Sequence, residues 1–241
     1  MPVVQLFVTC LVDGFAPSVG WATTSVLEGA GQTVEFPASQ TCCGQPALNS
    51  GLVPDARRMA KRLVRTLDAT SGPIVVPSGS CADMITHHVP GLLADTPLGP
   101  AALRVARRTR ELSQFLADDL GLDDVGASCE GCVGAYHPSC HGMRNLGVRE
   151  QPERLLDAVA GFERKTPAEA DQCCGFGGLF SIEMPAVSNA ILESKLDALE
   201  ETGAEVVVGT DMSCLIHIEG GLRRRGSEMR VMHLAEVLAS P

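Results

Sequence analysis

The sequence predicts an α/β fold made of two tandem, pseudo-symmetric repeats, each with a parallel sheet. Short apolar runs alternate with amphipathic helical patterns, and this order occurs in both halves of the 241 residues. Four cysteine positions also recur at nearly one spacing, because equivalent cysteines lie 130, 131, 131 and 133 residues apart. Chance placement would not set two adjacent-cysteine pairs in register, so the pattern indicates an internal duplication. The repeated positions are Cys10, Cys42, Cys43 and Cys81, followed by Cys140, Cys173, Cys174 and Cys214.

The two repeats are expected to be domains of similar size. A chain of this length accommodates two units of about 120 residues, and we predict one cysteine-rich repeat at residues 1–120 and a second at residues 121–241. The segment 121–126, with two glycines and two aspartates, is the predicted connection. Hydrophobic residues make up 45% and charged residues 20% of the chain, which is typical of a globular protein.

In the first half, strands and helices are predicted to alternate. The clearest helix starts at Pro54, because proline fits the first helical position and Leu63, Val64 and Leu67 share one face. Gly72-Pro73 ends this region before an apolar run. The predicted strands are residues 5–8, 33–36 and 74–76, and a further helix is predicted at residues 18–29.

The second half repeats this order. Pro185 starts a comparable helix, whose apolar side chains include Ile191, Leu192 and Leu196, and Gly203 follows its end. The predicted strands are residues 205–208 and 229–232, and a strand is also expected before Cys140.

The repeated cysteines are predicted to converge in each half. Cys10, Cys81, Cys140 and Cys214 come just past the carboxyl ends of strands, and the adjacent pairs lie in loops after the second strand of each half. Open α/β sheets bind their ligands at this edge. Helices predicted to begin after Cys81 and after Cys214 would direct N–H groups toward sulfur.

Four converging thiolates favour a metal centre assembled by the fold. Gaps of 31 residues between Cys10 and Cys42 and 37 between Cys43 and Cys81 are too long for a zinc knuckle or a ferredoxin run. Four thiolates are the protein ligands of a [4Fe–4S] cluster, so we predict two such clusters per chain. A zinc-stabilised structural or assembly protein and a thiol–disulfide oxidoreductase remain open alternatives.

Two cysteines lie outside the repeat. Cys129-Glu130-Gly131-Cys132 forms a separate C-x-x-C motif near the predicted connection. It could be a redox pair, additional ligands near Cys140, or two surface thiols.

Charge and hydropathy exclude other classes of protein. The formal charge of −10 argues against a general nucleic-acid binder, which needs a basic face. We find neither a signal peptide nor an apolar run of about 18 residues, so a cytoplasmic protein without a transmembrane segment is expected. No acid–base pair for abstracting a proton or hydride from a substrate stands out, and the catalytic residues are unassigned.

Six motifs identify a family that the chain resembles over nearly its whole length. They are Phe7-Val8-Thr9-Cys10, Cys42-Cys43-Gly44-Gln45-Pro46, Pro77-Ser78-Gly79-Ser80-Cys81, Tyr136-His137-Pro138-Ser139-Cys140, Cys173-Cys174-Gly175-Phe176-Gly177-Gly178 and Met232-His233-Leu234-Ala235-Glu236. With them the chain resembles the lactate-utilisation protein A family of iron–sulfur proteins. These proteins carry a duplicated cysteine-rich CCG domain and are related to heterodisulfide reductase B-type proteins and to the iron–sulfur protein of glycolate oxidase.

The resemblance implies an iron–sulfur electron-transfer subunit of an L-lactate-oxidising complex. It implies a ferredoxin-like LutB-type subunit and a LutC-type subunit as partners, while glycolate or another 2-hydroxy acid stays open as the substrate. The fullest CCG motif ends in C-x-x-C, but here Met84 and His217 occupy the last positions. Without a fifth thiolate, an ordinary four-thiolate cluster is favoured in each half, and His217 is a candidate additional ligand.

Overall fold

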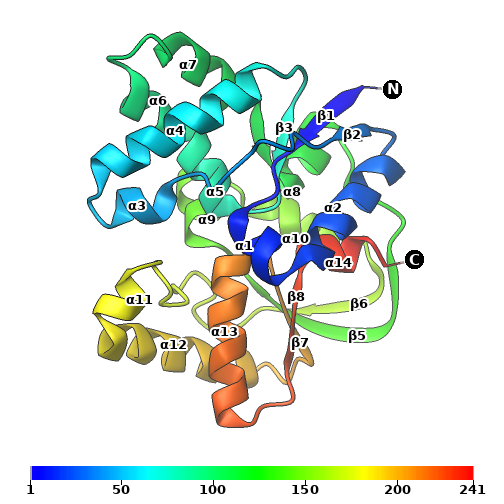
Figure 1. Ribbon diagram of the computed structural model, residues 1–241. Coiled ribbons are helices and arrows are strands. Elements are labelled where there is room, and N and C mark those ends of the chain that lie inside the picture. The colour runs from blue at the N-terminus through cyan, green and yellow to red at the C-terminus, as the bar shows by residue number, and fades with distance from the viewer. Residues whose placement is uncertain (1, 241) are drawn as a thin grey trace.

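The computed structural model describes residues 2–240 and contains two four-stranded parallel sheets (Figure 1). The first sheet has the order β2-β1-β3-β4 and the second has the order β6-β5-β7-β8, so each half repeats the same topology. The predicted α/β fold with two parallel-sheet repeats is therefore confirmed. The strands are β1 (Val3–Leu6), β2 (Thr33–Glu35), β3 (Ile74–Val76), β4 (Thr109–Glu111), β5 (Ser128–His137), β6 (Ala160–Lys165), β7 (Val206–Gly209) and β8 (Arg230–His233).

Helices connect the strands and cover the sheets (Figure 1). Within residues 2–240, none of them is long and apolar enough to cross a lipid bilayer. In the first half they are α1 (Cys10–Phe15), α2 (Pro17–Gly29), α3 (Gln45–Asn49), α4 (Val53–Asp68), α5 (Gly79–Asp83), α6 (Val89–Leu93), α7 (Gly99–Arg108) and α8 (Leu112–Gln114), with π-helical turns η1 (Met84–His88) and η2 (Phe115–Asp119). In the second half they are α9 (Cys140–Asn145), α10 (Glu150–Asp157), α11 (Phe180–Glu183), α12 (Pro185–Glu200), α13 (Met212–Arg225) and α14 (Leu234–Leu238).

Strand β3 shows how the first sheet is buried on both faces. Successive side chains of a strand point to opposite faces. Ile74 and Val76 accordingly join a core within the first half, whereas Val75 joins a core shared with the second half. The continuous apolar run of β3 is typical of a strand that is buried on both sides.

The two long helices predicted from their apolar faces occupy equivalent places. In α4, Leu63, Val64 and Leu67 are buried in the core of the first half, as the periodicity predicts. In α12, Leu192 and Leu196 are buried in the shared core. Both helices begin with proline at the first or second position, which satisfies the predicted starts.

Glycines and N-caps allow the two halves to meet closely. Helices α5 and α9 pack across the interface, and a Cβ atom added at Gly79 would lie 2.9 Å from the backbone nitrogen of Gly142. Ser78 caps α5 and Asp211 caps α13, and the Ser78 hydroxyl donates to Asp211 Oδ2 at 3.0 Å. Helix α14 packs against α2 in the same interface (Figure 1).

Strands β4 and β6 were not predicted from the sequence. Each carries charged residues, Arg110 and Glu111 in β4 and Glu163 to Lys165 in β6, and each lies at or near a sheet edge. The apolar signal that marks a buried strand is therefore weak in both. Pairing with a neighbouring strand, rather than local sequence, decides their conformation.

Glu111 at the end of β4 is a buried carboxyl group. Only 1% of the residue is exposed, and Glu111 Oε2 accepts hydrogen bonds from the backbone nitrogens of Ser113 at 2.8 Å and Gln114 at 3.2 Å. Its Oε1 atom has no hydrogen-bond partner among the described residues. Burial raises the pKa of Glu111 from 4.5 to about 7, although the hydrogen bonds oppose this shift.

We expect Glu111→Gln to remove a pH-dependent loss of stability. Below pH 4.5 both the folded and the unfolded chains hold this proton. As the pH rises to about 7 only the folded chain keeps it, so the free energy of unfolding falls by up to about 3 kcal/mol. Urea unfolding across this range should show the difference between wild type and variant changing with pH. Exposed Glu28→Gln is the control, and an equal pH slope in both variants would contradict the expectation.

Candidate metal centre

The structure brings four cysteines together at the carboxyl edge of the first sheet. Cys10 begins α1 after β1, Cys81 lies in α5 after β3, and the Cys42-Cys43 pair lies in the loop between β2 and α3. The Sγ atoms of Cys10 and Cys42 are 3.5 Å apart, and those of Cys43 and Cys81 are 3.3 Å apart. Cys43 and Cys81 are buried, whereas Cys10 is exposed, so the set opens to the surface on one side.

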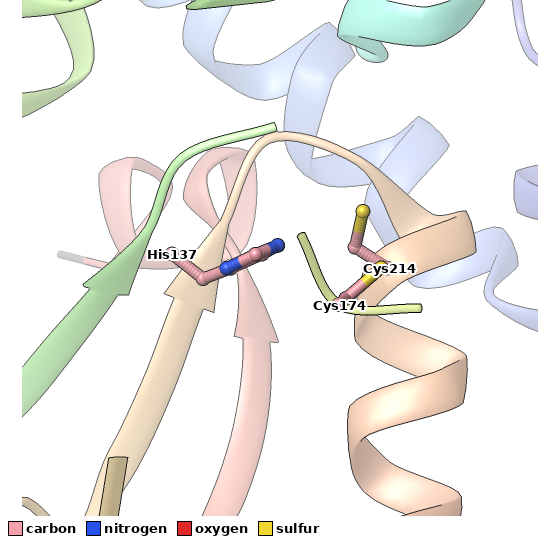
Figure 2. A group of neighbouring side chains, drawn as sticks. All are labelled: His137, Cys174 and Cys214. Atoms are coloured by element: carbon pink, nitrogen blue, oxygen red, sulfur yellow. The ribbon is translucent and has the colours of Figure 1, made fainter. Parts of the chain in front are cut away.

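The second half repeats this arrangement. Cys140 begins α9 after β5, Cys214 lies in the first turn of α13 after β7, and the Cys173-Cys174 pair follows β6. The thiol of Cys173 interacts with those of Cys140 and Cys174, and the thiol of Cys174 interacts with that of Cys214. Figure 2 shows the imidazole of His137 directed toward Cys174 and Cys214, and the ligand atoms of these three residues lie within 4.8 Å of one another.

Two helices begin earlier than the sequence predicted. Helix α5 starts at Gly79 and α13 at Met212, so Cys81 and Cys214 lie within their first turns and do not precede them. The physical reason is N-capping. The Ser78 side chain accepts a hydrogen bond from the Cys81 backbone nitrogen, and the Asp211 side chain accepts one from the Ser213 backbone nitrogen. Both cysteines are thereby carried on capped helical turns, which limit the movement of their sulfur atoms.

The sulfur atoms of each set share protons unequally. Hydrogen bonds from Cys10 and Cys43 lower the pKa of Cys42 to about 3, and those from Cys140 and Cys174 lower the pKa of Cys173 to about 2. Hydrogen bonding to Cys42, together with burial, raises the pKa of Cys10. Hydrogen bonding to Cys173, together with burial, raises the pKa of Cys140. One thiolate surrounded by S–H donors in each half is an environment that a cation would stabilise, with release of the remaining protons.

The glycine after each cysteine pair allows close backbone packing. Gly44 has φ +92° and Gly175 has φ +88°, a conformation that other residues rarely adopt. A Cβ atom at Gly175 would lie 2.6 Å from the backbone oxygen of Ser188, and the Ser188 hydroxyl donates to the Gly175 oxygen at 2.8 Å. The loop is thus fixed against α12 at the point where Cys173 and Cys174 enter the site.

Gly175→Ala should therefore destabilise the protein more than Gly178→Ala does. Both glycines have positive φ, which costs a residue with a Cβ atom about 1–2 kcal/mol. At Gly178 no atom lies within 4 Å of the added Cβ, whereas at Gly175 the clash adds about 1–3 kcal/mol. Denaturant unfolding of the two variants measures the difference, and equal losses would contradict this account of the loop.

Two buried polar residues distinguish the second site from the first. His137 is 1% exposed, and neither ring nitrogen has a hydrogen-bond partner among the described residues. Lys195 is fully buried and donates to the backbone oxygen atoms of Glu169 and Ala170 at 3.3 and 3.0 Å. The first half has apolar residues at the corresponding positions, Phe7 and Leu63. The second site therefore holds an imidazole and a cation that the first site lacks.

The protonation of these two residues follows from their burial. Burial, aided by the charge of Lys195, lowers the pKa of His137 to about 3, so the imidazole is neutral and carries one N–H. Burial also lowers the pKa of Lys195, and negative charge on Cys140 and Cys174 opposes this shift. Neither residue is marked for this role by a local sequence pattern. Aligning the halves by their cysteines and by the apolar faces of α4 and α12 places these residues opposite Phe7 and Leu63.

The donor set fits a thiolate-bound metal centre. Each half presents four sulfur atoms from three separate segments of the chain, and His137 offers the second half a nitrogen without a hydrogen-bond partner among the described residues. Thiolates select soft metal ions and iron–sulfur clusters. Clustered cysteines in two cysteine-rich domains thus indicate metal or iron–sulfur binding.

His217 lies beside the second set and supports its loop. Its Nε2 atom is 3.3 Å from the Ser188 hydroxyl, and its ring contacts Phe176 edge-on with centroids 5.8 Å apart. Ser188 in turn holds Gly175, so His217 contacts the loop that carries the adjacent cysteines. In the first half, Met84 at the corresponding position is fully buried.

The two sites are joined by hydrogen bonds across the interface. Asp83, two residues after Cys81, accepts from Asn145 at 2.8 Å and lies 2.7 Å from Nδ1 of His141, which follows Cys140. The Nε2 atoms of Gln45 and His141 are 3.4 Å apart. Burial alone would raise the pKa of Asp83, but hydrogen bonds from His141, His87 and Asn145 lower it. The hydrogen bond with Asp83 in turn raises the pKa of His141. The sites are therefore neighbours within one polar network.

Comparison with known proteins agrees with this architecture. The model of the cysteine-rich domain family CCG matches residues 4–86 and 133–219, which include all eight repeated cysteines. The chain is 48% identical over 238 residues to lactate utilization protein A of Bacillus cytotoxicus and 46% identical over 235 residues to that of Geobacillus kaustophilus, covering 98% of either protein in both cases.

A solved structure also shares the fold. A hypothetical protein from Helicobacter pylori superposes with a TM-score of 0.70 at 12% identity, over 99% of this chain. This chain spans only 49% of that one, and the likeness concerns the fold alone. Two matches to the cysteine-rich domain and the close relatives lead to one conclusion: the chain carries the CCG domain in duplicate and belongs to the lactate utilization protein A family.

Proposed function

We propose that this chain is an iron–sulfur electron-transfer subunit of an L-lactate-oxidising system. The observation that carries the proposal is the convergence of four cysteines in each half at the carboxyl edge of a parallel sheet. Two [4Fe–4S] clusters would be held by Cys10, Cys42, Cys43 and Cys81 and by Cys140, Cys173, Cys174 and Cys214, within domains 1–120 and 121–241. When bound, such clusters supply one-electron transfer.

The packing of the two sites supports a relay within the chain. Cys81 and Cys140 lie on α5 and α9, which pack against one another, and Cys10 and Cys214 lie on α1 and α13, which are also in contact. Asp83 and His141 link α5 to α9 directly, and Gln45 of α3 contacts His141. Two centres on packed helices suit the transfer of single electrons from one half to the other.

The names of the relatives support lactate utilisation as the biological role. A LutB-type ferredoxin-like subunit and a LutC-type subunit would then be the partners, and the lactate site would lie outside this chain. Anaerobic co-purification of the three proteins tests this. L-lactate should bleach the visible absorbance of the complex, whereas this chain alone with L-lactate should not change. Bleaching by glycolate and not by L-lactate would overturn the choice of substrate.

His137→Phe should make the second centre resemble the first, where Phe7 lies three residues before Cys10. The neutral imidazole faces the sulfur atoms, and N–H donors to sulfur stabilise the more negative, reduced state. We expect the reduction potential of the second centre to fall while that of the first stays constant. Redox-poised EPR measures both, and equal shifts in the two signals, or none, would contradict this role of His137.

A zinc-stabilised structural protein is the second candidate, favoured by one observation. Sulfur atoms 3.3 and 3.5 Å apart in the first half are nearer the spacing of about 3.8 Å around a single tetrahedral zinc ion than that of a larger cluster. Metal analysis separates the candidates, because zinc without labile sulfide would favour the structural role.

A further inference from the structure

Cys129 and Cys132 are brought together by an irregularity in strand β5. Ser128 pairs with Ala160 and Cys132 pairs with Phe162, so β5 advances four residues where its neighbour β6 advances two. In a regular strand, residues three apart point to opposite faces. Here the bulge, with Gly131 at φ +65°, lets the two thiols approach, and the interaction of Cys132 with Cys129 raises the pKa of Cys132.

The neighbouring strand is adapted to this bulge. Gly161 in β6 has φ +78°, and a Cβ atom there would lie only 2.1 Å from the backbone oxygen of Cys129. No other residue fits at this position without moving the bulge. Two strands thus combine to hold the thiols of the C-x-x-C motif near each other.

The pair is separate from the candidate metal centre. Both cysteines are half-exposed, and the charges nearest Cys132 belong to Glu205 and Arg230, which lie at the amino-terminal ends of β7 and β8. The repeated cysteines lie at the opposite, carboxyl ends. At about 3.3 Å per residue, about 16 Å of strand separates Cys132 from His137.

We propose that Cys129 and Cys132 form a reversible disulfide by exchange with a low-molecular-weight disulfide such as oxidised glutathione. The Cys129 thiolate attacks one sulfur of the small disulfide, which forms a mixed disulfide and releases one thiol. Cys132 then loses its proton and attacks the Cys129 sulfur, which closes the protein disulfide and releases the second thiol. Two protein thiols are oxidised and one small disulfide is reduced to two thiols.

The order of attack follows from the protonation of Cys132. Its interaction with Cys129, together with burial, raises the pKa of Cys132 to about 11, so Cys132 keeps its proton and is a poor attacking group. Cys129 is therefore the attacking residue and Cys132 the resolving one.

Protein purified anaerobically with its metal is incubated with oxidised and reduced glutathione in varied ratio, and free thiols are then blocked with N-ethylmaleimide. Cleavage after Glu130 and after Tyr136 places Cys129, Cys132 and Cys140 on three different fragments, so the fragments that stay together in unreduced mass spectra identify the disulfide. We expect linked fragments under oxidising ratios and their loss on reduction. Cys132→Ser should trap glutathione on Cys129, and Cys129→Ser should accumulate much less adduct.

Two outcomes would overturn the proposal. In the first, N-ethylmaleimide labels both Cys129 and Cys132 at every glutathione ratio and no linked fragments form. In the second, Cys129 or Cys132 forms a disulfide with Cys140 in place of the predicted pair. The iron content of the same samples is measured separately, so the test of the disulfide does not depend on the proposed electron-transfer function. Linked fragments in iron-free protein would leave the disulfide standing while that function fails.

Discussion

Cys174→Ser is expected to remove the metal of the second half and leave that of the first, and Cys43→Ser should do the reverse. Both cysteines are 2% exposed and contact other members of their own set, so a serine there withdraws a central ligand. Iron per chain should fall by about half in each variant and to near zero in the double variant, because each half holds its own cluster. Iron and sulfide analysis after anaerobic reconstitution measures this.

Cys132→Ser is the matched control, because it removes a cysteine outside both sets. Its iron content should equal that of the unchanged protein. Loss of all iron from either single variant would mean that the eight cysteines hold one shared centre. Full iron content in both would exclude these cysteines as the ligands.

Asp211→Ala should cause the largest loss of stability, about 3–5 kcal/mol. The carboxylate is 2% exposed and bridges the halves, since Oδ2 accepts from the Ser80 backbone nitrogen at 2.8 Å while Oδ1 accepts from that of Ser213 at 3.0 Å. Alanine would leave both N–H groups without this acceptor and would remove the cap of α13. Urea unfolding of the metal-free protein measures the loss.

Asp211→Asn provides the comparison, because its amide oxygen replaces one of the two carboxylate oxygens. It should retain the helix cap or the contact to Ser80, and therefore lose about half as much stability. Similar values for the alanine and asparagine variants would contradict the bridging role of Asp211.

The cysteine register predicted most of the architecture for a physical reason. Equivalent cysteines in a duplicated fold follow equivalent strands, and the carboxyl ends of parallel strands meet at one edge. The structure accordingly brings Cys10 near Cys42 and Cys43 near Cys81, from three separate segments. The apolar faces of α4 and α12 were also predictable from the sequence, because a helix buried on one side has apolar residues that recur with the helical period.

Other features depend on tertiary contacts that no local pattern records. Strand β4 exists because its backbone pairs with β3, although its sequence is Thr-Arg-Glu. The imidazole of His137 is neutral because the folded chain buries it, and α12 adds the charge of Lys195, which favours the same state. The proximity of Cys129 to Cys132 requires a bulge that a regular strand would not contain.

The central claim is that each half of the chain holds one four-iron cluster. The most direct test is iron, zinc and acid-labile sulfide analysis of the anaerobically purified, full-length protein, together with EPR after reduction. We predict about eight iron and about eight sulfide ions per chain, little zinc, and signals from two centres. About one zinc per half without sulfide, or protein that stays colourless and iron-free after reconstitution, would contradict the claim.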